Sequence, residues 1–232
     1  MESTYIEDSD SDDLAEVFSP PRVVPFANLY NLNGFSMDLL TGTDLQTLAG
    51  RMELDRALTR KRPLMVILSP PCTMYSSLNW SLNHSRLPSH TWNERLRKAD
   101  ALLRTAMRVA AQQVSQGRYF VFEHPACAKS WSTDMVQTVF AMPGVRRATF
   151  DQCRYGLVGP SGQPMRKRTS FLTNCSFVFT EFDGKYCQCT GTHQRIIGTE
   201  LGEPLAAWAA HYPPRLCRAL ARCVRDRRLS EA

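Results

Sequence analysis

Six short apolar segments recur along the chain and predict the strands of one sheet. Each is rich in the aliphatic, β-branched or aromatic residues that buried strands favour. They lie at 14–18, 35–40, 64–68, 119–123, 147–150 and 169–172. Between the third and fourth segments, apolar residues of 92–116 recur every three or four positions, and Gly117 follows as a helix C-cap. Strands that alternate with helices favour an α/β fold with a mostly parallel central sheet and helices on both faces.

Shorter helices are predicted towards the C-terminus, and the composition changes there. The expected helices lie at 135–142, 204–211 and 214–229. Cys, Gly and His become more frequent from about Asn174 onwards. We therefore expect three regions: an acidic disordered N-terminus at 1–13, an α/β domain at 14–175, and a small Cys/His-containing appendage with a basic helix at 176–232.

Length and composition favour an intracellular α/β protein. Of the 232 residues, 43% are hydrophobic, which is enough for one substantial core. No apolar run is long enough to span a membrane, and the N-terminus lacks the pattern of a signal peptide. The eight cysteines are scattered, which indicates free thiols in a reducing compartment and not a disulfide framework.

Charge is distributed unevenly. The net charge is +6, but residues 1–16 hold seven carboxylates and no Lys or Arg. Residues 17–232 therefore contain all 28 Lys and Arg residues and fifteen carboxylates, which gives this part a net charge of +13. This excess favours a polyanionic partner such as nucleic acid, although solubility alone is the simpler explanation. The positions expected to contact phosphate lie on the C-terminal helix: Arg215, Arg218, Arg222 and Arg225.

Three motifs with reactive groups stand beside predicted strands. Cys72 follows two prolines at the end of the third strand, where open α/β sheets bind their ligands. Glu123 ends the fourth strand. Arg166 and Arg168 precede the sixth and, at i and i+2, share one face of an extended chain. We expect these groups to meet at one edge of the sheet, although a buried Cys, a capping Glu and solvated arginines would each be ordinary alone.

The order of these motifs resembles that of the C5-cytosine methyltransferases. Pro70-Pro71-Cys72-Thr73-Met74-Tyr75-Ser76 is similar to their nucleophile motif, Pro-Pro-Cys-x-x-(Phe/Tyr)-Ser. Glu123-His124-Pro125 stands in the place of their Glu-Asn-Val. Arg166-Lys167-Arg168 resembles their Gln-x-Arg-x-Arg, with Gln163 one residue early. Glu16-Val17-Phe18-Ser19 is similar to the start of their cofactor-binding strand.

The resemblance covers roughly residues 14–175, and it is closer still to divergent methyltransferase-like domains of retroelement polyproteins. It implies a Rossmann-like methyltransferase fold that transfers a methyl group from S-adenosylmethionine to carbon 5 of cytosine, in DNA more than RNA and hence in the nucleus. It makes Cys72 the nucleophile, Glu123 the acid that binds the base, and Arg166 and Arg168 ligands of base and phosphate. The implied cofactor contacts are Phe18, Ser19, Asp38, Asp44 and Pro70.

Departures from the family leave a second hypothesis open. Ser19-Pro20-Pro21-Arg22 replaces the glycine-rich turn of the family, and prolines remove backbone donors. Only about 60 residues follow Arg168, so the large target-recognition region is missing. The alternative is an inactive methyltransferase fold that binds nucleic acid within a mobile-element protein. A small recognition region would also suit an RNA methyltransferase.

A cysteine and histidine cluster near the C-terminus predicts a zinc site. Cys187, Cys189 and His193 are closely spaced, and Cys175 lies twelve residues before the first of them. Zinc prefers tetrahedral sites built from Cys and His, and a metal would stabilise a small loop-rich region. The Cys-x-Cys spacing is less usual than Cys-x2-Cys, so a loop of unpaired thiols is the alternative.

Overall fold

A six-stranded sheet forms the centre of the computed structural model, which describes residues 11–231. The strands are β1 (Leu14–Val17), β2 (Gly34–Met37), β3 (Met65–Leu68), β4 (Tyr119–Pro125), β5 (Arg146–Asp151) and β6 (Arg168–Thr173). Their order is β2-β1-β3-β4-β6-β5. Strands β1 to β4 run parallel, and β6 is antiparallel to both of its neighbours. The predicted strands and the mostly parallel sheet are confirmed.

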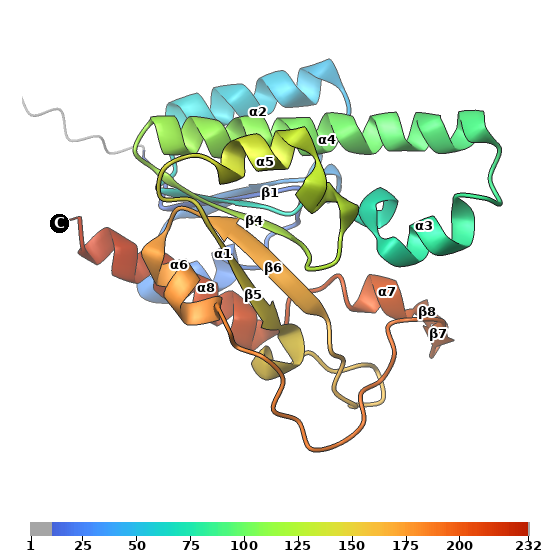
Figure 1. Cartoon of the computed structure of the whole chain (residues 1–232). Helices are drawn as coiled ribbons and strands as arrows, with labels where there is room; N and C mark the ends of the chain where they lie inside the picture. Colours follow the sequence, from blue (N-terminus) through green and yellow to red (C-terminus); the bar gives the residue numbers. More distant parts are fainter. Residues whose placement is uncertain (1–10, 232) are drawn as a thin grey trace, which may run out of the picture.

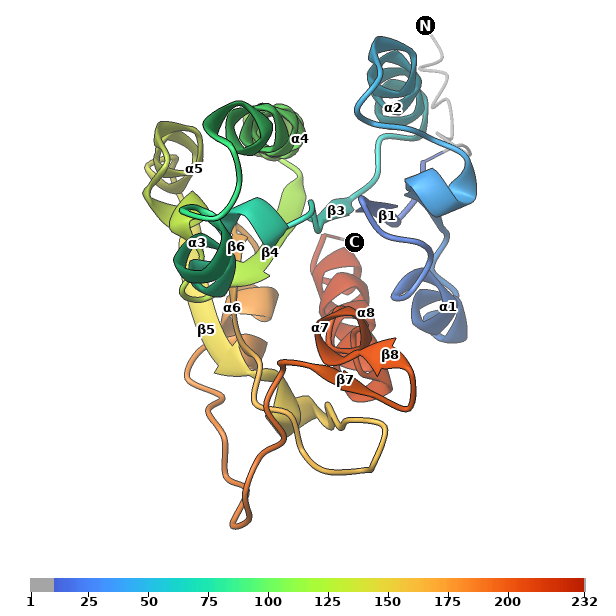
Figure 2. The same ribbon diagram turned by 90° about the vertical axis from the view of Figure 1, so that its right-hand side faces the viewer.

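Helices cover both faces of the sheet (Figure 1). One layer holds α2 (Leu48–Lys61), α4 (Ser89–Ser115) and α5 (Asp134–Phe140); the other holds α1 (Val24–Ala27), α6 (Ser176–Phe182) and α8 (Pro214–Leu229). Figure 2 looks along the sheet and separates the two layers. The remaining elements are α3 (Ser77–Asn83), α7 (Leu205–Trp208), β7 (Thr199–Glu200), β8 (Glu203–Pro204), and the short 3-10 helices η1 (Asn28–Tyr30), η2 (Leu39–Thr41), η3 (Thr73–Tyr75), η4 (Lys129–Ser132) and η5 (Gln152–Tyr155). No helix within residues 11–231 has the length and apolar character needed to cross a membrane.

Alternation along the strands divides the core into two apolar layers. On β4, Phe120 and Phe122 pack in the layer of α4, whereas Val121 packs in the layer of α8. Because both faces are covered, β3 is buried at every position. This explains why the third apolar segment reads as a continuous hydrophobic run instead of an alternating one.

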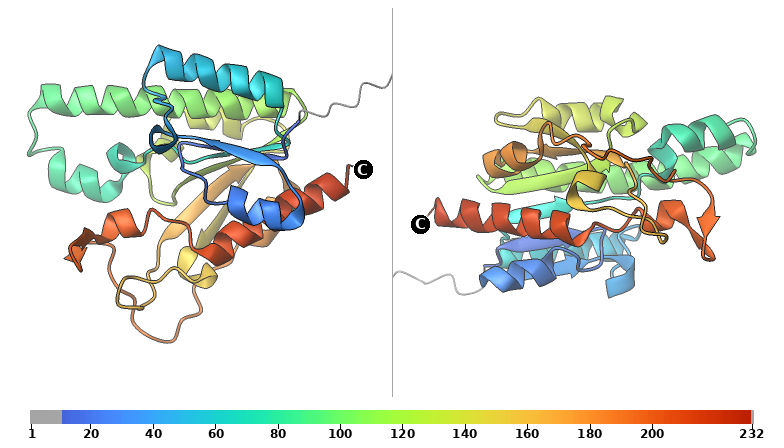
Figure 3. Two further views of the ribbon diagram at one scale, coloured as in Figure 1. Left: turned by 180° about the vertical axis from the view of Figure 1, so that it is seen from behind. Right: turned by 90° about the horizontal axis from the view of Figure 1, so that it is seen from below.

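The C-terminal region shares this core. Phe182 of α6 and Leu216 and Leu220 of α8 are fully buried in the same cluster as Phe171 of β6. Helix α8 lies beneath the sheet and runs along the direction of its strands (Figure 3). The boundary expected at residue 175 therefore does not separate two cores. The segment between α6 and α7, which carries three members of the Cys/His cluster, projects away from the layers beside the connection between η5 and β6 (Figure 1).

The end of the expected disordered terminus belongs to the fold. The carboxylate of Asp12 lies 2.7 Å from Lys61 Nζ, and that of Asp13 lies 3.2 Å from a guanidinium nitrogen of Arg228. These two pairs tie the entry of β1 to the ends of α2 and α8. The rest of the expected disordered segment, residues 1–10, lies outside the described residues.

Candidate functional site

The sheet has its topological switch point between β1 and β3. The chain moves from β1 outward to β2 and then returns to the other side of β1 as β3. At such a point the loops after the two strands diverge and leave a crevice at their carboxyl ends, which is where open α/β sheets bind ligands. Phe18 follows β1 and Pro70-Pro71-Cys72 follows β3, so the motifs singled out in the sequence border this crevice.

Cys72 and Glu123 come together at the carboxyl ends of two neighbouring strands. Cys72 is half-buried at the start of η3, just beyond β3. Glu123 lies on β4, the strand paired with β3, and only 6% of its surface is exposed. Burial raises the pKa of the Cys72 thiol, and the Glu123 charge raises it further. The thiol and the carboxylate therefore share one partly desolvated environment, as the sequence predicts.

The cation beside this pair is Lys167, and not Arg166 or Arg168. Lys167 Nζ lies 3.4 Å from Glu123 Oε1 and lowers the pKa of Cys72. Arg168 instead makes two 2.9 Å hydrogen bonds to the carboxylate of Asp151, on the opposite face of the sheet, and the charge of Arg166 acts on Asp151 as well. The expectation that Arg166 and Arg168 join Cys72 and Glu123 is wrong by one position along the chain, because the residue between them, Lys167, faces Glu123. Since side chains alternate along a strand, that slip exchanges the two faces.

One oxygen of Glu123 accepts no hydrogen bond within the described part of the chain. This is Oε1, which is buried and faces only the Lys167 ammonium at 3.4 Å. Burying a carboxylate is costly unless it is paired, and the ion pair with Lys167 offsets part of that cost while leaving Oε1 able to accept a further hydrogen bond. Glu123 is therefore placed to accept a hydrogen bond from a group that enters beside Cys72.

His124 holds the turn that carries the thiol. Its ring is fully buried between Ser130 Oγ at 2.6 Å and the Pro70 carbonyl at 3.2 Å. Burial lowers the pKa of His124 to about 3, so the ring is neutral near pH 7 and its Nε2–H donates to the Pro70 oxygen. His124 fixes the carbonyl two residues before Cys72, which makes it a positioning residue.

Tyr212 is a member of the site that the sequence reasoning missed. It comes from the connection between α7 and α8, and its hydroxyl lies 2.8 Å from Ser69 Oγ. Burial, followed by the charge of Glu123, raises the pKa of Tyr212, so its hydroxyl stays protonated. The only signal in the sequence is the pair Pro213-Pro214, which fixes the chain direction immediately after this tyrosine.

The opposing effects of Lys167 and Glu123 on Cys72 can be measured by alkylation. We expect Lys167→Met to raise the pKa of Cys72 and slow its reaction with iodoacetamide, by roughly three- to tenfold at fixed pH, because one pKa unit is tenfold in thiolate. Glu123→Gln should speed the reaction. Because the chain has eight cysteines, the rate is measured by mass spectrometry as the alkylated fraction of the peptide that contains Cys72. Arg168→Met is the matched control and should leave the rate unchanged; slowing equal to that of Lys167→Met would contradict the assignment.

The expected cofactor contacts divide into two groups. Phe18, Asp38 and Asp44 line a single cavity of about 110 Å³, together with Pro71, beside the switch point. Phe18 has a left-handed backbone (φ 66°), an uncommon conformation for an aromatic residue and one that occurs where loops serve ligands. The two carboxylates accept nearby backbone N–H groups, from Leu40 and Gln46 respectively, so they also shape the loop that walls the cavity.

Ser19 and Pro70 do not line that cavity. The Ser19 hydroxyl donates to the Pro20 carbonyl at 2.8 Å, and the Ser19 carbonyl accepts a hydrogen bond from Ser36. The Pro70 carbonyl faces His124. Both residues therefore support the turns at the edge of the crevice.

The turn after β1 directs its amides inward, to Glu16. Oε2 of this fully buried carboxylate accepts the N–H groups of Arg22, Val23 and Val24 at 2.8–2.9 Å. Pro20 and Pro21 have no N–H to offer. In glycine-rich turns these amides point at the ligand. Here the amides of 22–24 are already bonded within the protein.

The expected phosphate contacts on α8 are not equivalent. Arg215 and Arg218 are exposed and line a groove of about 440 Å³ that Arg154 and Lys185 also line. Arg222 reaches the same groove but lies 3.7 Å from Glu181. Arg225 pairs with Asp226 at 2.7 Å and lies over the ring of Tyr30. Arg215 and Arg218 are thus the members of the set best placed to meet a polyanion.

The cysteine and histidine cluster forms with one change of member. Cys187, Cys189 and His193 gather with Cys153 of η5, and their ligand atoms all lie within 4.8 Å of one another. Cys175, the expected fourth member, is instead buried in the core at the N-terminus of α6. The Cys189 N–H donates to Cys187 Sγ at 3.3 Å and lowers the pKa of that thiol. Spacing along the chain favours Cys175, the nearest cysteine before Cys187. The fold instead brings Cys153 to the cluster from the end of β5.

Comparison with known proteins gives a distant structural likeness. No family model matches the chain, and no curated protein matches it. Among solved structures, a methyltransferase of Entamoeba histolytica, EhMeth, is similar over 70% of this chain, with 10% sequence identity and a TM-score of 0.44. The match spans 52% of that protein, about half of its length.

Proposed function

We propose that this protein transfers a methyl group from S-adenosylmethionine to carbon 5 of cytosine in nucleic acid, with DNA favoured over RNA. The observation that carries the proposal is the meeting of the Cys72 thiol with the buried Glu123 carboxylate, whose Oε1 is paired with Lys167 but accepts no hydrogen bond. Carbon 5 of cytosine is a poor nucleophile and must be activated. A thiol to attack carbon 6 and a carboxyl group to bind the N3 side of the ring are the two groups that this activation needs.

The residues of the site have distinct roles in this reaction. Cys72 gives its proton to Glu123 as sulfur adds to carbon 6. The protonated Glu123 then donates to N3 of the base, and its other oxygen accepts a hydrogen bond from the exocyclic amine. Lys167 stabilises the thiolate and the carboxylate around this exchange. When carbon 5 has been methylated, its proton leaves to solvent, the carbon–sulfur bond breaks, and Cys72 and Glu123 return to their starting states. A base in a duplex must first be flipped out of the stack, at a cost of a few kcal/mol.

The cavity at the switch point suits part of the cofactor. S-adenosylmethionine supplies an electrophilic methyl group when bound. The Phe18 ring and the carboxylates of Asp38 and Asp44 match an adenosine in chemistry, with an aromatic face and acceptors for hydroxyl and amino groups. The volume of about 110 Å³ is below the ~300–1,000 Å³ of ligand sites, so binding has to displace the loop from Asp38 to Thr47 outward.

The direct test is methyl transfer from isotopically labelled S-adenosylmethionine to matched DNA and RNA oligonucleotides. Digestion to nucleosides should place the label on 5-methylcytosine. Label in DNA supports the proposal in full, whereas label in RNA alone reassigns the substrate. Absence of label from both, with a folded protein that binds the nucleic acid, would contradict the proposal.

A second candidate is a methyltransferase-like fold that binds nucleic acid without catalysis. The turn after β1 favours it, because its amides are bonded to Glu16 and its prolines have none. Thermal unfolding with S-adenosylhomocysteine separates the two candidates. At a hundredfold excess over the Kd, a bound ligand stabilises the native state by about 2.7 kcal/mol, which raises the Tm by several degrees. An unchanged Tm at millimolar ligand would favour the inactive module.

Under either candidate, the exposed arginines of α8 are expected to contact phosphate. Arg215→Ala with Arg218→Ala should reduce the slope of log K against log salt for duplex DNA by about 1.8, because each phosphate contact contributes about 0.9. Fluorescence anisotropy over a series of salt concentrations measures the slope. The matched control is Arg225→Ala with Arg227→Ala, since both of those side chains are paired with carboxylates. Equal slopes for the two double variants would show that the groove lined by Arg215 and Arg218 does not contact DNA.

A further inference from the structure

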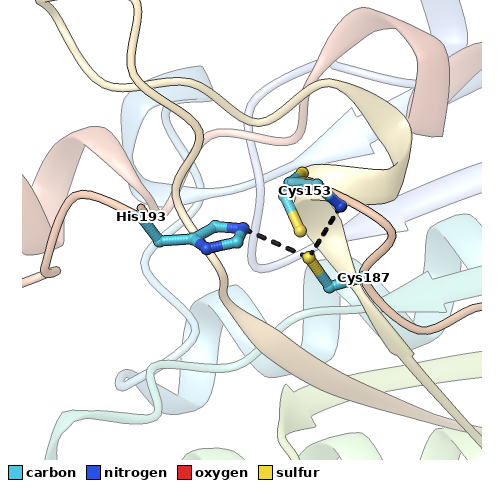
Figure 4. Close-up of side chains that lie close together, drawn as sticks. Cys153, Cys187 and His193 are labelled. Carbon is cyan, nitrogen blue, oxygen red and sulfur yellow. Dashed lines mark hydrogen bonds between the residues drawn. The ribbon is translucent and has the colours of Figure 1, made fainter. Parts of the chain in front are cut away.

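Four metal-binding side chains converge at the end of β5, far from Cys72 along the chain. Cys153 belongs to η5, directly after β5, and Cys187, Cys189 and His193 belong to the segment between α6 and β7. Figure 4 shows Cys153, Cys187 and His193 pointing toward one another. The ligand atoms of all four residues lie within 4.8 Å of one another. We propose that they bind one structural Zn²⁺ ion that ties this segment to the end of β5.

The distances match a tetrahedral site. With Zn–S bonds of about 2.3 Å and Zn–N bonds of about 2.0–2.1 Å, ligand atoms at tetrahedral angles lie ~3.6–3.8 Å apart. Cys187 Sγ and His193 Nε2 are 3.2 Å apart, and no pair in the cluster exceeds 4.8 Å. Small rotations of these side chains bring the set to that geometry. Three thiolates and one imidazole are a ligand set that zinc prefers, and four protein ligands leave no open position, which is typical of structural sites.

A metal would add a tether to the segment that carries three of the ligands. Residues 183–198 contain no helix or strand, and long connections of this kind are uncommon unless something orders them. Its first part runs along β5 through hydrogen bonds from Gly184 N to the Thr149 carbonyl and from Asp151 N to the Lys185 carbonyl. The Cys187 N–H then donates to Asp151 Oδ2 at 3.0 Å. The metal would close the remainder of the loop onto this anchored start.

The cluster is also connected to the candidate active site. Asp151 accepts from Cys187 N on one side and binds Arg168 on the other. Arg168 is the first residue of β6 and directly follows Lys167, the residue that faces Glu123. Asp151 thus links the loop that carries Cys187 to the first residue of β6.

Zinc binding is coupled to the release of protons from its ligands. The ion binds the three cysteines as thiolates and the imidazole through a nitrogen lone pair, so any proton on these groups is released when the ion binds. The affinity should therefore fall as the pH falls.

Metal content of the full chain tests the proposal. Protein purified without chelators, or reconstituted with zinc chloride, should hold one zinc per chain by atomic emission. Cobalt(II) added to the metal-free chain should give the intense visible absorption of tetrahedral thiolate coordination. Cys189→Ala, at an exposed position, and Cys153→Ala should both lose the zinc. Cys175→Ala, with Cys127→Ala as a second control outside the cluster, should retain it.

Two results would overturn the proposal. One is a reconstituted full chain that holds no zinc. The other is zinc that survives Cys153→Ala and is lost in Cys175→Ala. A separate readout tests the tether: removal of zinc by a chelator should open residues 183–198 to a protease while the rest of the chain resists. Equal cleavage of the two forms would show that the ion does not order the segment.

Discussion

Replacing Cys72 with alanine is expected to reduce methyl transfer to cytosine by more than ~10³-fold. Without the thiol nothing adds to carbon 6, so carbon 5 stays unactivated and bound cofactor cannot compensate. The measurement is incorporation of labelled methyl groups into cytosine-containing DNA, with the Tm recorded in parallel. The Tm should change little, because the side chain is only half-buried and small.

The neighbouring exposed thiol supplies the control for this variant. Cys127 lies close enough to affect the pKa of Cys72, yet it is exposed in the turn after β4 and lies outside the Pro70-Pro71-Cys72 motif. Cys127→Ala should retain activity within a few-fold. Retained transfer in Cys72→Ala would remove the nucleophile from the mechanism, and a loss in both variants would point to a shared local disturbance.

Glu123→Gln is expected to lower the rate of methyl transfer by ~10²–10⁴-fold, the range for a lost acid or base. The amide keeps the size of the side chain but cannot take the Cys72 proton or pass it to N3. The variant should have opposite effects in two assays: faster alkylation of Cys72, because a negative charge is removed, and slower methyl transfer. This opposition distinguishes a group that acts on the base from one that only tunes the thiol.

Asp151→Asn is the matched comparison for Glu123→Gln. It also removes a buried carboxylate paired with a cation, but on the other face of the sheet, next to Arg168. It should cost stability and leave alkylation of Cys72 unchanged. Methyl transfer that falls equally in the two variants, at equal Tm, would indicate that Glu123 has no special role.

The strands can be predicted from the sequence because burial on two faces leaves long apolar runs. The pattern also predicts helix α8 at its observed bounds, since Pro214 begins a clear amphipathic repeat. It misses helix α2, which buries only Gly50, Leu54 and Leu58 among fourteen residues, half of them polar. It misses helix α6 as well, because the aromatic and β-branched residues there are those that strands favour, and only packing against β6 and α8 makes the segment helical.

The site shows where local pattern stops being informative. Cys72 and Glu123 can be recognised because each ends a clear strand. The choice between Lys167 and its arginine neighbours depends on strand register, and one residue of uncertainty at a strand start exchanges the two faces. The fourth member of the Cys/His cluster is Cys153 and not Cys175, because the fold brings the end of β5 next to the loop that carries the other three. Neither register nor tertiary proximity can be obtained from spacing along a single sequence.

The most direct measurement is mass spectrometry of the protein after incubation with S-adenosylmethionine and DNA that contains 5-fluorocytosine. Fluorine at carbon 5 cannot leave as a proton does, so the sulfur–carbon bond persists after methyl transfer. We predict a covalent adduct on the peptide that contains Cys72, and its absence in Cys72→Ala. No adduct, or an adduct on another cysteine, would contradict the assignment of the thiol beside Glu123 as the nucleophile.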